Sequence, residues 1–188
     1  MSRLPVAALA LLAGAQLACT PKPLEILGTV HDFELTAQTG RAVRLADLRG
    51  RVWVADTIFT TCTGPCPMMS ARMRTLAREV GTLPDVRFVS LTVDPEHDTP
   101  AALSAYASRF QAKPDRWIFL TGTQPALDEV CKGSLALSSV NGDLSHSTRF
   151  ALIDREARIR GYYLSTSADA MQRLVADIKA LAAQTSPI

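Results

Sequence analysis

Two kinds of segment alternate along most of this chain, and the alternation restricts the fold more than any single residue does. Short runs of apolar and β-branched residues, typical of buried strands, are each followed by a longer segment whose apolar residues recur at helical spacing. The strand-like runs are residues 52–59, 86–93 and 117–122. The helix-like segments that follow them are residues 67–80, 99–110 and 124–137. Strands separated by helices need crossover connections, so we predict an α/β fold with helices on both faces of the sheet.

Further strand-like segments lie on either side of this region, and those on the C-terminal side make the predicted central sheet mixed. On the N-terminal side, "DFEL" and "AVRL" flank the turn-like "QTGR", which predicts a β-hairpin with Gly40 in its tight turn. On the C-terminal side, "TRFALID" and "RIRGYYL" predict two strands joined at "REAR". Thr99 is the predicted N-cap of its helix, and Ser167 is the predicted N-cap of a last helix over residues 167–184.

The bulk composition is that of one globular domain with an appendage. The chain has 188 residues, of which 47% are hydrophobic and 20% are charged. Its 20 basic and 18 acidic side chains give a net charge of +2, and neither sign forms a run along the sequence. Because nucleic-acid binders carry a concentrated basic patch or stripe, the sequence predicts no nucleic-acid partner.

The first 18 residues have the pattern of an export signal. Arg3 precedes an apolar run over residues 4–15, which is shorter than the roughly 20 residues that span a bilayer. The following "QLAC" resembles the processing site of bacterial lipoproteins, although Gln16 stands where that pattern usually has leucine. The alternatives are a lipid on Cys19, signal cleavage without a lipid, and a retained anchor helix. We predict a periplasmic, membrane-anchored protein with a tether over residues 19–30 and a domain over residues 31–185.

Two cysteines lie four positions apart in "IFTTCTGPCPMM", where a predicted strand leads into a predicted helix. Pro67 suits the first helical position, so Cys66 is the predicted N-cap and Cys62 lies in the preceding loop. The helix N-terminus carries unpaired amides and a partial positive charge. These favour the thiolate, which is both the nucleophilic and the metal-binding form of cysteine.

Three interpretations of this pair remain open from the residues alone. A structural disulfide would close a very short loop and stabilise the fold little. A dithiol oxidoreductase favours the shorter Cys-x-x-Cys spacing. A soft-metal site would use two thiolates and select Cu(I), with one or two further ligands. We expect Cys131, which lies among apolar residues of a predicted helix, to be a small buried side chain outside the site.

Histidine could supply the third ligand, and the chain has three. His31 and His97 lie in polar segments and are expected to be exposed. His146 follows a polar loop at the entrance of a strand, where it is either a ligand or a loop histidine bonded to a backbone carbonyl. Asp94 is either a carboxylate that supports the site or an ordinary loop residue.

The methionines and tryptophans are expected to serve packing. Met69 and Met73 fall on the apolar face of the predicted helix, whereas Met68 is offset from that face and is not expected to bind metal. Trp53 and Trp117 lie within predicted strands and are expected in the core.

Four segments, "FTTCTGPCPMMS", "LTVDPEHDTPAAL", "RWIFLTG" and "HSTRFALID", together resemble the Sco/SenC family of copper-delivery proteins. The resemblance implies a thioredoxin-like domain held at a membrane, with Cys62, Cys66 and His146 as copper ligands. Many members have proline after the first cysteine, where this chain has Thr63, so the shape of the loop is expected to differ.

The function that this resemblance implies is that of an exported copper metallochaperone, which would deliver copper to the copper centre of cytochrome c oxidase. Its partners would be the copper-receiving subunit of a terminal oxidase, other copper chaperones and thiol reductants. Two thiolates and an imidazole suit Cu(I), and they suit Cu(II) if a further ligand is added. A disulfide between the two cysteines would remove both thiolate ligands at once. The enzymatic alternative is a thiol-disulfide oxidoreductase, or a thiol peroxidase, acting on cysteines of exported proteins. A structural domain with an incidental disulfide is a third hypothesis.

Overall fold

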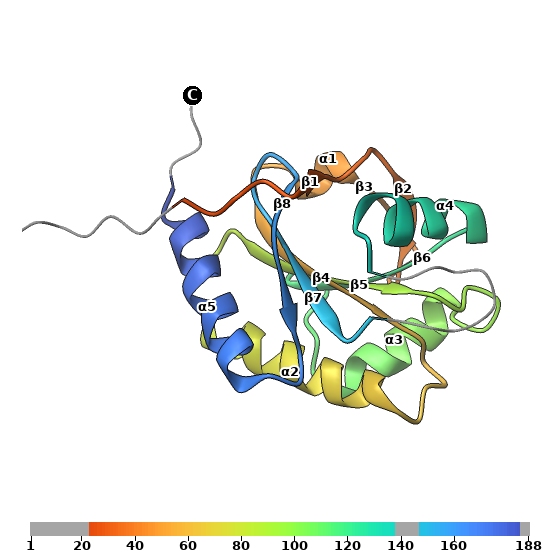
Figure 1. Ribbon diagram of the computed structural model, residues 1–188. Coiled ribbons are helices and arrows are strands. Elements are labelled where there is room, and N and C mark those ends of the chain that lie inside the picture. The colour runs from red at the N-terminus through yellow and green to blue at the C-terminus, as the bar shows by residue number, and fades with distance from the viewer. Residues whose placement is uncertain (1–22, 138–146, 185–188) are drawn as a thin grey trace, which may run out of the picture.

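An eight-stranded sheet runs through the part of the chain that the computed structural model describes, residues 23–137 and 147–184 (Figure 1). Its strands lie in the order β1-β8-β7-β4-β5-β6-β2-β3. They are β1 (Gly28–Thr29), β2 (Glu34–Ala37), β3 (Ala42–Arg44), β4 (Val52–Ile58), β5 (Val86–Thr92), β6 (Trp117–Thr121), β7 (Arg149–Ile153) and β8 (Arg158–Leu164). The helices are α1 (Leu45–Leu48), α2 (Pro65–Glu79), α3 (Pro100–Arg109), α4 (Gln124–Asp128), the π-helix η1 (Glu129–Ser134) and α5 (Ala168–Ala182).

The sheet is mixed, as predicted. Strands β4, β5 and β6 are parallel, and they are joined through α2 and α3. On one side β7 pairs antiparallel with β4, and β8 with β7; on the other side β2 pairs antiparallel with β6. The predicted hairpin is β2 and β3, and Gly40 in its turn has a φ of 80°, which favours glycine.

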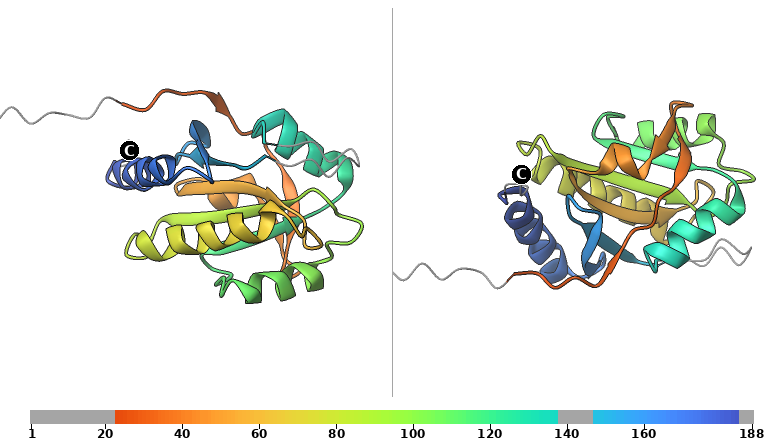
Figure 2. Two further views of the ribbon diagram at one scale, coloured as in Figure 1. Left: turned by 60° about the horizontal axis from the view of Figure 1, so that its bottom comes forward. Right: turned by 90° about the horizontal axis from the view of Figure 1, so that it is seen from above.

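Helices cover both faces of the sheet, with α2, α3 and α5 on one face and α1 and α4 on the other (Figures 1 and 2). All seven residues of β4 are buried, because both of its faces are covered. Val54 and Ile58 pack in the cluster that holds α2, whereas Trp53 and Ala55 pack in the cluster that holds η1. The predicted α/β fold with helices on both faces is therefore confirmed.

The predicted helix caps are present. Thr99 is the N-cap of α3, and its hydroxyl accepts a hydrogen bond from the Ala102 amide at 3.2 Å. Ser167 is the N-cap of α5 and accepts from the Ala170 amide, also at 3.2 Å. Each side chain satisfies an amide that has no partner within its own helix.

The prediction of a single helix over residues 124–137 is wrong for the second half of that segment. α4 ends at Asp128, and the chain continues as the π-helix η1, where the Leu135 amide donates to the Val130 carbonyl five residues earlier at 2.8 Å. Gly133 lies within η1. A Cβ at this position would meet the Glu129 carboxylate at 3.0 Å, so a larger residue here would require that side chain to move slightly.

The packed chain reaches back into the segment expected to be a tether. The Leu27 amide donates to the Ile159 carbonyl at 2.8 Å, and β1 then pairs with β8. The buried Arg160 guanidinium donates to the carbonyls of Leu24 and Glu25. The predicted export signal and Cys19 lie outside the described residues. Within the described residues, none of the helices has the length and apolar character needed to cross a membrane.

Candidate metal centre

Helix α2 begins at the cysteine pair, two residues earlier than expected. Gly64 is the N-cap, Pro65 is the first helical residue and Cys66 is the second, so the prediction of Cys66 as N-cap is wrong. Both Pro65 and Pro67 fit into the first turn because amides there have no partner within the helix, and a missing N–H is not a loss. The shift moves Cys66 from the edge of the helix into the core, where it is 0% exposed.

Cys62 lies half-buried in the loop between β4 and α2. Its amide donates to the Phe59 carbonyl at 3.2 Å, which turns the chain back toward the helix. Both cysteines are reduced thiols, and a hydrogen bond joins their two side chains. The fold therefore brings the two sulfur atoms into contact at the start of α2.

Burial strongly raises the pKa of the Cys66 thiol above its ordinary value, and the hydrogen bond with Cys62 raises it further. A hydrogen bond with the Phe59 backbone acts in the opposite direction but is the smaller effect. The expectation that the helix N-terminus would favour the thiolate is therefore wrong for Cys66. The cost of desolvating the thiolate outweighs its stabilisation by the helix N-terminus, since the sulfur is enclosed by apolar side chains.

A buried carboxyl group lies near the pair on the α2 side of the sheet. Asp56 is 0% exposed, and burial raises its pKa to about 7. Its Oδ1 accepts from the Ser90 hydroxyl at 2.6 Å, and the Ser90 oxygen accepts from Trp117 Nε1 at 2.9 Å. Its Oδ2 has no hydrogen-bond partner among the described residues. The negative charge of Asp56 also raises the pKa of Cys66. The sequence signal for this group was the single acidic residue in an otherwise apolar strand.

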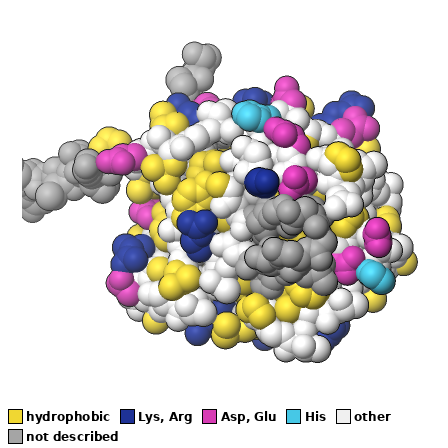
Figure 3. Space-filling model, turned by 45° about the vertical axis from the view of Figure 1, so that its right-hand side comes forward, with side chains coloured by type: hydrophobic (Ala, Val, Ile, Leu, Met, Phe, Trp, Pro, Cys, Tyr) yellow, Lys and Arg dark blue, Asp and Glu magenta, His cyan; other side chains and the backbone are white. Residues whose placement is uncertain are grey.

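His31 and His97 are exposed, as predicted, and each lies beside a carboxylate (Figure 3). His97 Nδ1 lies 2.9 Å from the carboxylate of Asp94, which raises the pKa of His97. His31 Nδ1 lies 3.2 Å from Glu129 Oε1. Asp94 is therefore a buried loop carboxylate whose partner is His97.

The expected packing residues are in the core. Met69, Met73, Trp53 and Trp117 are at most 2% exposed, whereas Met68 is 44% exposed. Cys131 is 0% exposed and packs on the face opposite to Cys66, so the sheet separates the two. Cys131 is therefore a buried side chain, as predicted, and it lies apart from the cysteine pair.

His146, the predicted third ligand, lies outside the described residues. Among residues 23–137 and 147–184, the structure contains no group of three or more His, Cys, Asp and Glu side chains suited to hold a metal ion. Within that part of the chain, the candidate centre consists of the two thiols.

A comparison with protein families identifies the chain. The sequence model of the SCO1/SenC family matches residues 24–183. The chain belongs to the SCO1/SenC family. The family predicted from the four sequence segments is thereby confirmed.

Three solved structures are similar to this SCO1/SenC chain. A SCO1/SenC family lipoprotein from Bacillus anthracis str. Ames is 32% identical, with a TM-score of 0.76 over 86% of this chain and 98% of that one. BsSco, a Sco-family cytochrome c oxidase assembly protein with a disulfide switch, is 31% identical, with the same TM-score and coverage. Bradyrhizobium japonicum ScoI, with copper bound, is 25% identical, with a TM-score of 0.68 over 81% of this chain and 99% of that one. The thioredoxin-like fold is confirmed.

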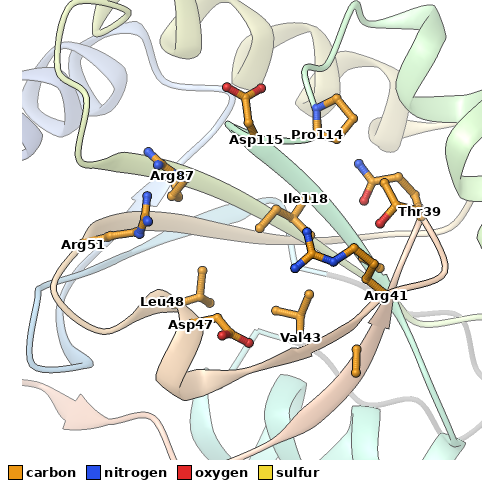
Figure 4. Close-up of a pocket in the computed structure, with 13 residues that line it drawn as sticks. Thr39, Arg41, Val43, Asp47, Leu48, Arg51, Arg87, Pro114, Asp115 and Ile118 are labelled. Carbon is orange, nitrogen blue, oxygen red and sulfur yellow. The ribbon is translucent and has the colours of Figure 1, made fainter.

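A separate hollow of about 370 Å³ in this SCO1/SenC chain is lined by arginines (Figure 4). Arg51 directly precedes β4 and Arg87 is the second residue of β5, so the hollow lies at the N-terminal ends of the parallel strands. The cysteine loop follows the C-terminal end of β4. The hollow and the cysteine pair therefore lie at opposite ends of the sheet.

Proposed function

We propose that this chain is an exported copper chaperone, which holds copper through Cys62, Cys66 and His146 and passes it to the copper-receiving subunit of a terminal oxidase. The observation that carries the proposal is the pair of reduced thiols in contact at the start of α2. Similar proteins support it, because ScoI has been solved with copper and BsSco belongs to a family of oxidase assembly proteins.

The donor set fits copper better than harder ions. Thiolate sulfur is a soft ligand and selects Cu(I), for which two thiolates and an imidazole complete a three-coordinate site. Because burial keeps Cys66 protonated, metal binding must release its proton, and affinity should rise with pH. A disulfide between the two cysteines would remove both anionic ligands, so copper binding would depend on the redox state of the pair.

The sheet register supports His146 as the third ligand. β7 pairs with β4 so that Ala151 lies opposite Ala55, which brings the start of β7 toward the C-terminal end of β4. Arg149 is the first residue of β7, and His146 precedes it by only three positions. A residue so close to this end of the sheet needs to cross only a short distance to reach the cysteine loop.

We place the protein in the periplasm, anchored through a lipid on Cys19. The support is the "QLAC" sequence and the similarity to a SCO1/SenC family lipoprotein. Anchoring at a membrane would keep the chaperone near a membrane-bound oxidase.

Anaerobic Cu(I) titration of the reduced full chain against a competing chelator tests the proposal. We expect one Cu(I) per chain, with affinity reduced at least about tenfold by His146→Ala because one of three ligands is lost. His97→Ala is the matched control, since His97 is exposed and already paired with Asp94, and its affinity should equal that of wild type. Unchanged affinity in His146→Ala would exclude this histidine as a ligand.

A thiol-disulfide oxidoreductase is the second candidate function. The hydrogen bond between the two thiols favours it, because sulfurs in contact can form a disulfide with little movement. Turnover of a disulfide substrate that survives His146→Ala but is lost in Cys62→Ser would support this reaction. Absence of turnover in the wild-type chain would leave copper binding as the role of the pair.

A further inference from the structure

One buried carboxylate joins two loops at the C-terminal ends of the parallel strands. The first loop follows β4 and carries Thr60 and Cys62; the second follows β5 and ends at Asp98, which is 0% exposed. Asp98 Oδ2 accepts hydrogen bonds from the Thr60 amide at 3.1 Å and from the Thr92 hydroxyl at 2.5 Å. Asp98 Oδ1 accepts from the Thr60 hydroxyl. The carboxylate is therefore bonded to the residue two positions before Cys62.

The chemistry around Asp98 requires a group that only accepts hydrogen bonds. The Thr92 oxygen already accepts from the Asp94 amide at 2.9 Å, so its own proton is directed to Asp98. The Thr60 amide can only donate. An ionised carboxylate provides two accepting oxygens, whereas an asparagine would turn an NH₂ group toward these donors. A buried charge is costly unless it is hydrogen-bonded, so this set of donors is matched to a carboxylate.

The first loop transmits this restraint to both sulfur atoms. Phe59 is adjacent to Thr60, its carbonyl accepts from the Cys62 amide at 3.2 Å, and its backbone is hydrogen-bonded to Cys66. The second loop is itself fixed, because the Asp98 amide donates to the Asp94 carbonyl at 2.9 Å. Residues 59–62 are thus held between the Asp98 carboxylate and Cys66.

We propose that Asp98 is a positioning residue for the cysteine pair: through Thr60 it fixes the loop that carries Cys62, and it thereby sets the distance between the two sulfurs. The inference rests on the proposed function, in which both sulfurs bind one ion. Asp98 itself contacts neither sulfur. It acts by holding the donors in place before the ion arrives, which reduces the ordering cost of binding.

The reduction potential of the pair measures this restraint without any metal. The full chain is equilibrated with glutathione, whose oxidised form takes two electrons and two protons from the thiols and becomes two reduced glutathiones while the Cys62–Cys66 disulfide forms. Loosening the loop lowers the effective concentration of one thiol at the other. We therefore expect Asp98→Asn to shift the equilibrium about tenfold toward the dithiol, or about 30 mV. A shift below about twofold would overturn the proposal.

Asp154→Asn is the matched control for lost stability. Asp154 is also a buried carboxylate, 3% exposed, and it accepts from the Arg158 amide and from the Arg160 guanidinium. It lies beyond the end of β7, at the end of the sheet opposite to the cysteine loop. The control should be destabilised as well but should keep the wild-type reduction potential. A potential shifted equally in both variants would show a general effect of stability and would refute the role of Asp98.

Two variants of Thr60 keep the test valid if Asp98→Asn does not fold. Thr60→Val removes the hydroxyl donor at nearly constant volume, and Thr60→Ser retains it. We expect Thr60→Val to shift the potential in the same direction as Asp98→Asn, and Thr60→Ser to restore the wild-type value. Equal potentials for the two Thr60 variants would contradict the proposal.

Copper affinity provides a second readout, for which we expect about a tenfold loss in Asp98→Asn but not in Asp154→Asn. If the wild-type chain binds no copper, the proposed function fails. The glutathione measurement still decides the role of Asp98 in that case, because it requires only the two thiols.

Discussion

At the scale of single residues, burial dominates the chemistry of this chain. Cys66 and Asp56 both lie on the α2 side of the sheet, and in both the neutral form is favoured. The spacing of the cysteines was readable from the sequence. The protonation state of Cys66 was not, because it depends on how deeply α2 places its side chain, and that depth changes when the helix starts two residues earlier.

Asp56 should make stability fall as the pH rises. Its pKa is 3.8 in the unfolded chain and about 7 in the folded protein, so well below pH 3.8 the carboxyl is protonated in both states and does not make stability depend on pH. Between pH 4 and pH 7 only the unfolded chain ionises, which lowers the free energy of unfolding by about 1.4 kcal/mol per pH unit. Above pH 7 the loss is complete.

Urea denaturation at several pH values, comparing wild type with Asp56→Asn, measures this contribution. The variant should lack the fall between pH 4 and pH 7, whatever its absolute stability. Asp115→Asn, which alters an exposed carboxylate, is the control and should follow the wild-type profile. Parallel profiles for wild type and Asp56→Asn would show that Asp56 is ionised throughout.

At the scale of elements, periodicity predicted most helices and strands but not their local irregularities. The predictions of Thr99 and Ser167 as N-caps were correct, because a short polar side chain just before an amphipathic helix usually accepts a hydrogen bond from an amide of the first turn. The start of α2 was missed because Pro65 and Pro67 are both compatible with a first turn, and the sequence does not choose between them. The π-helix was missed because apolar periodicity does not distinguish an α-helical turn from the wider turn of a π-helix.

Two methionines of α2 provide a test of how this helix packs. Met73→Ala should lower the free energy of unfolding by about 2–5 kcal/mol, because it leaves a cavity in the core. Met68→Ala should change it by less than about 0.5 kcal/mol, since Met68 lies at the surface and is 44% exposed. Chemical denaturation of both variants measures the difference. Equal losses would mean that α2 is rotated from the orientation described here.

At the scale of the whole molecule, folding assembles groups that are scattered in the sequence. The family and the thioredoxin-like fold were predictable, because four motifs and the alternation of elements are local signals. The arginine-lined hollow was not, since Arg41, Arg51 and Arg87 come from separate segments of a chain with no basic run. The two thiols were predictable as neighbours, whereas His146 as a third ligand stays a prediction.

Copper should stabilise the whole domain if it binds as proposed. Free Cu(I) at 100 times its Kd adds about 2.7 kcal/mol to the free energy of unfolding, which raises the Tm by roughly 5–10 °C for a chain of this size. Removing copper with a chelator should return the Tm to its original value. Thermal unfolding of the reduced and oxidised forms is the measurement. An equal rise in the oxidised form would locate copper away from the two thiols.

The hydrogen bonds from Arg160 to the carbonyls of Leu24 and Glu25 also limit the distance between the domain and a membrane anchor at the N-terminus. With a lipid on Cys19, Leu24 would be only five residues from the bilayer, and five fully extended residues span about 17 Å. That length is close to the radius of gyration of a domain of this size, about 15 Å. The domain would then stay close to the membrane surface. A partner protein would have to present its docking site at the same short distance from the lipid.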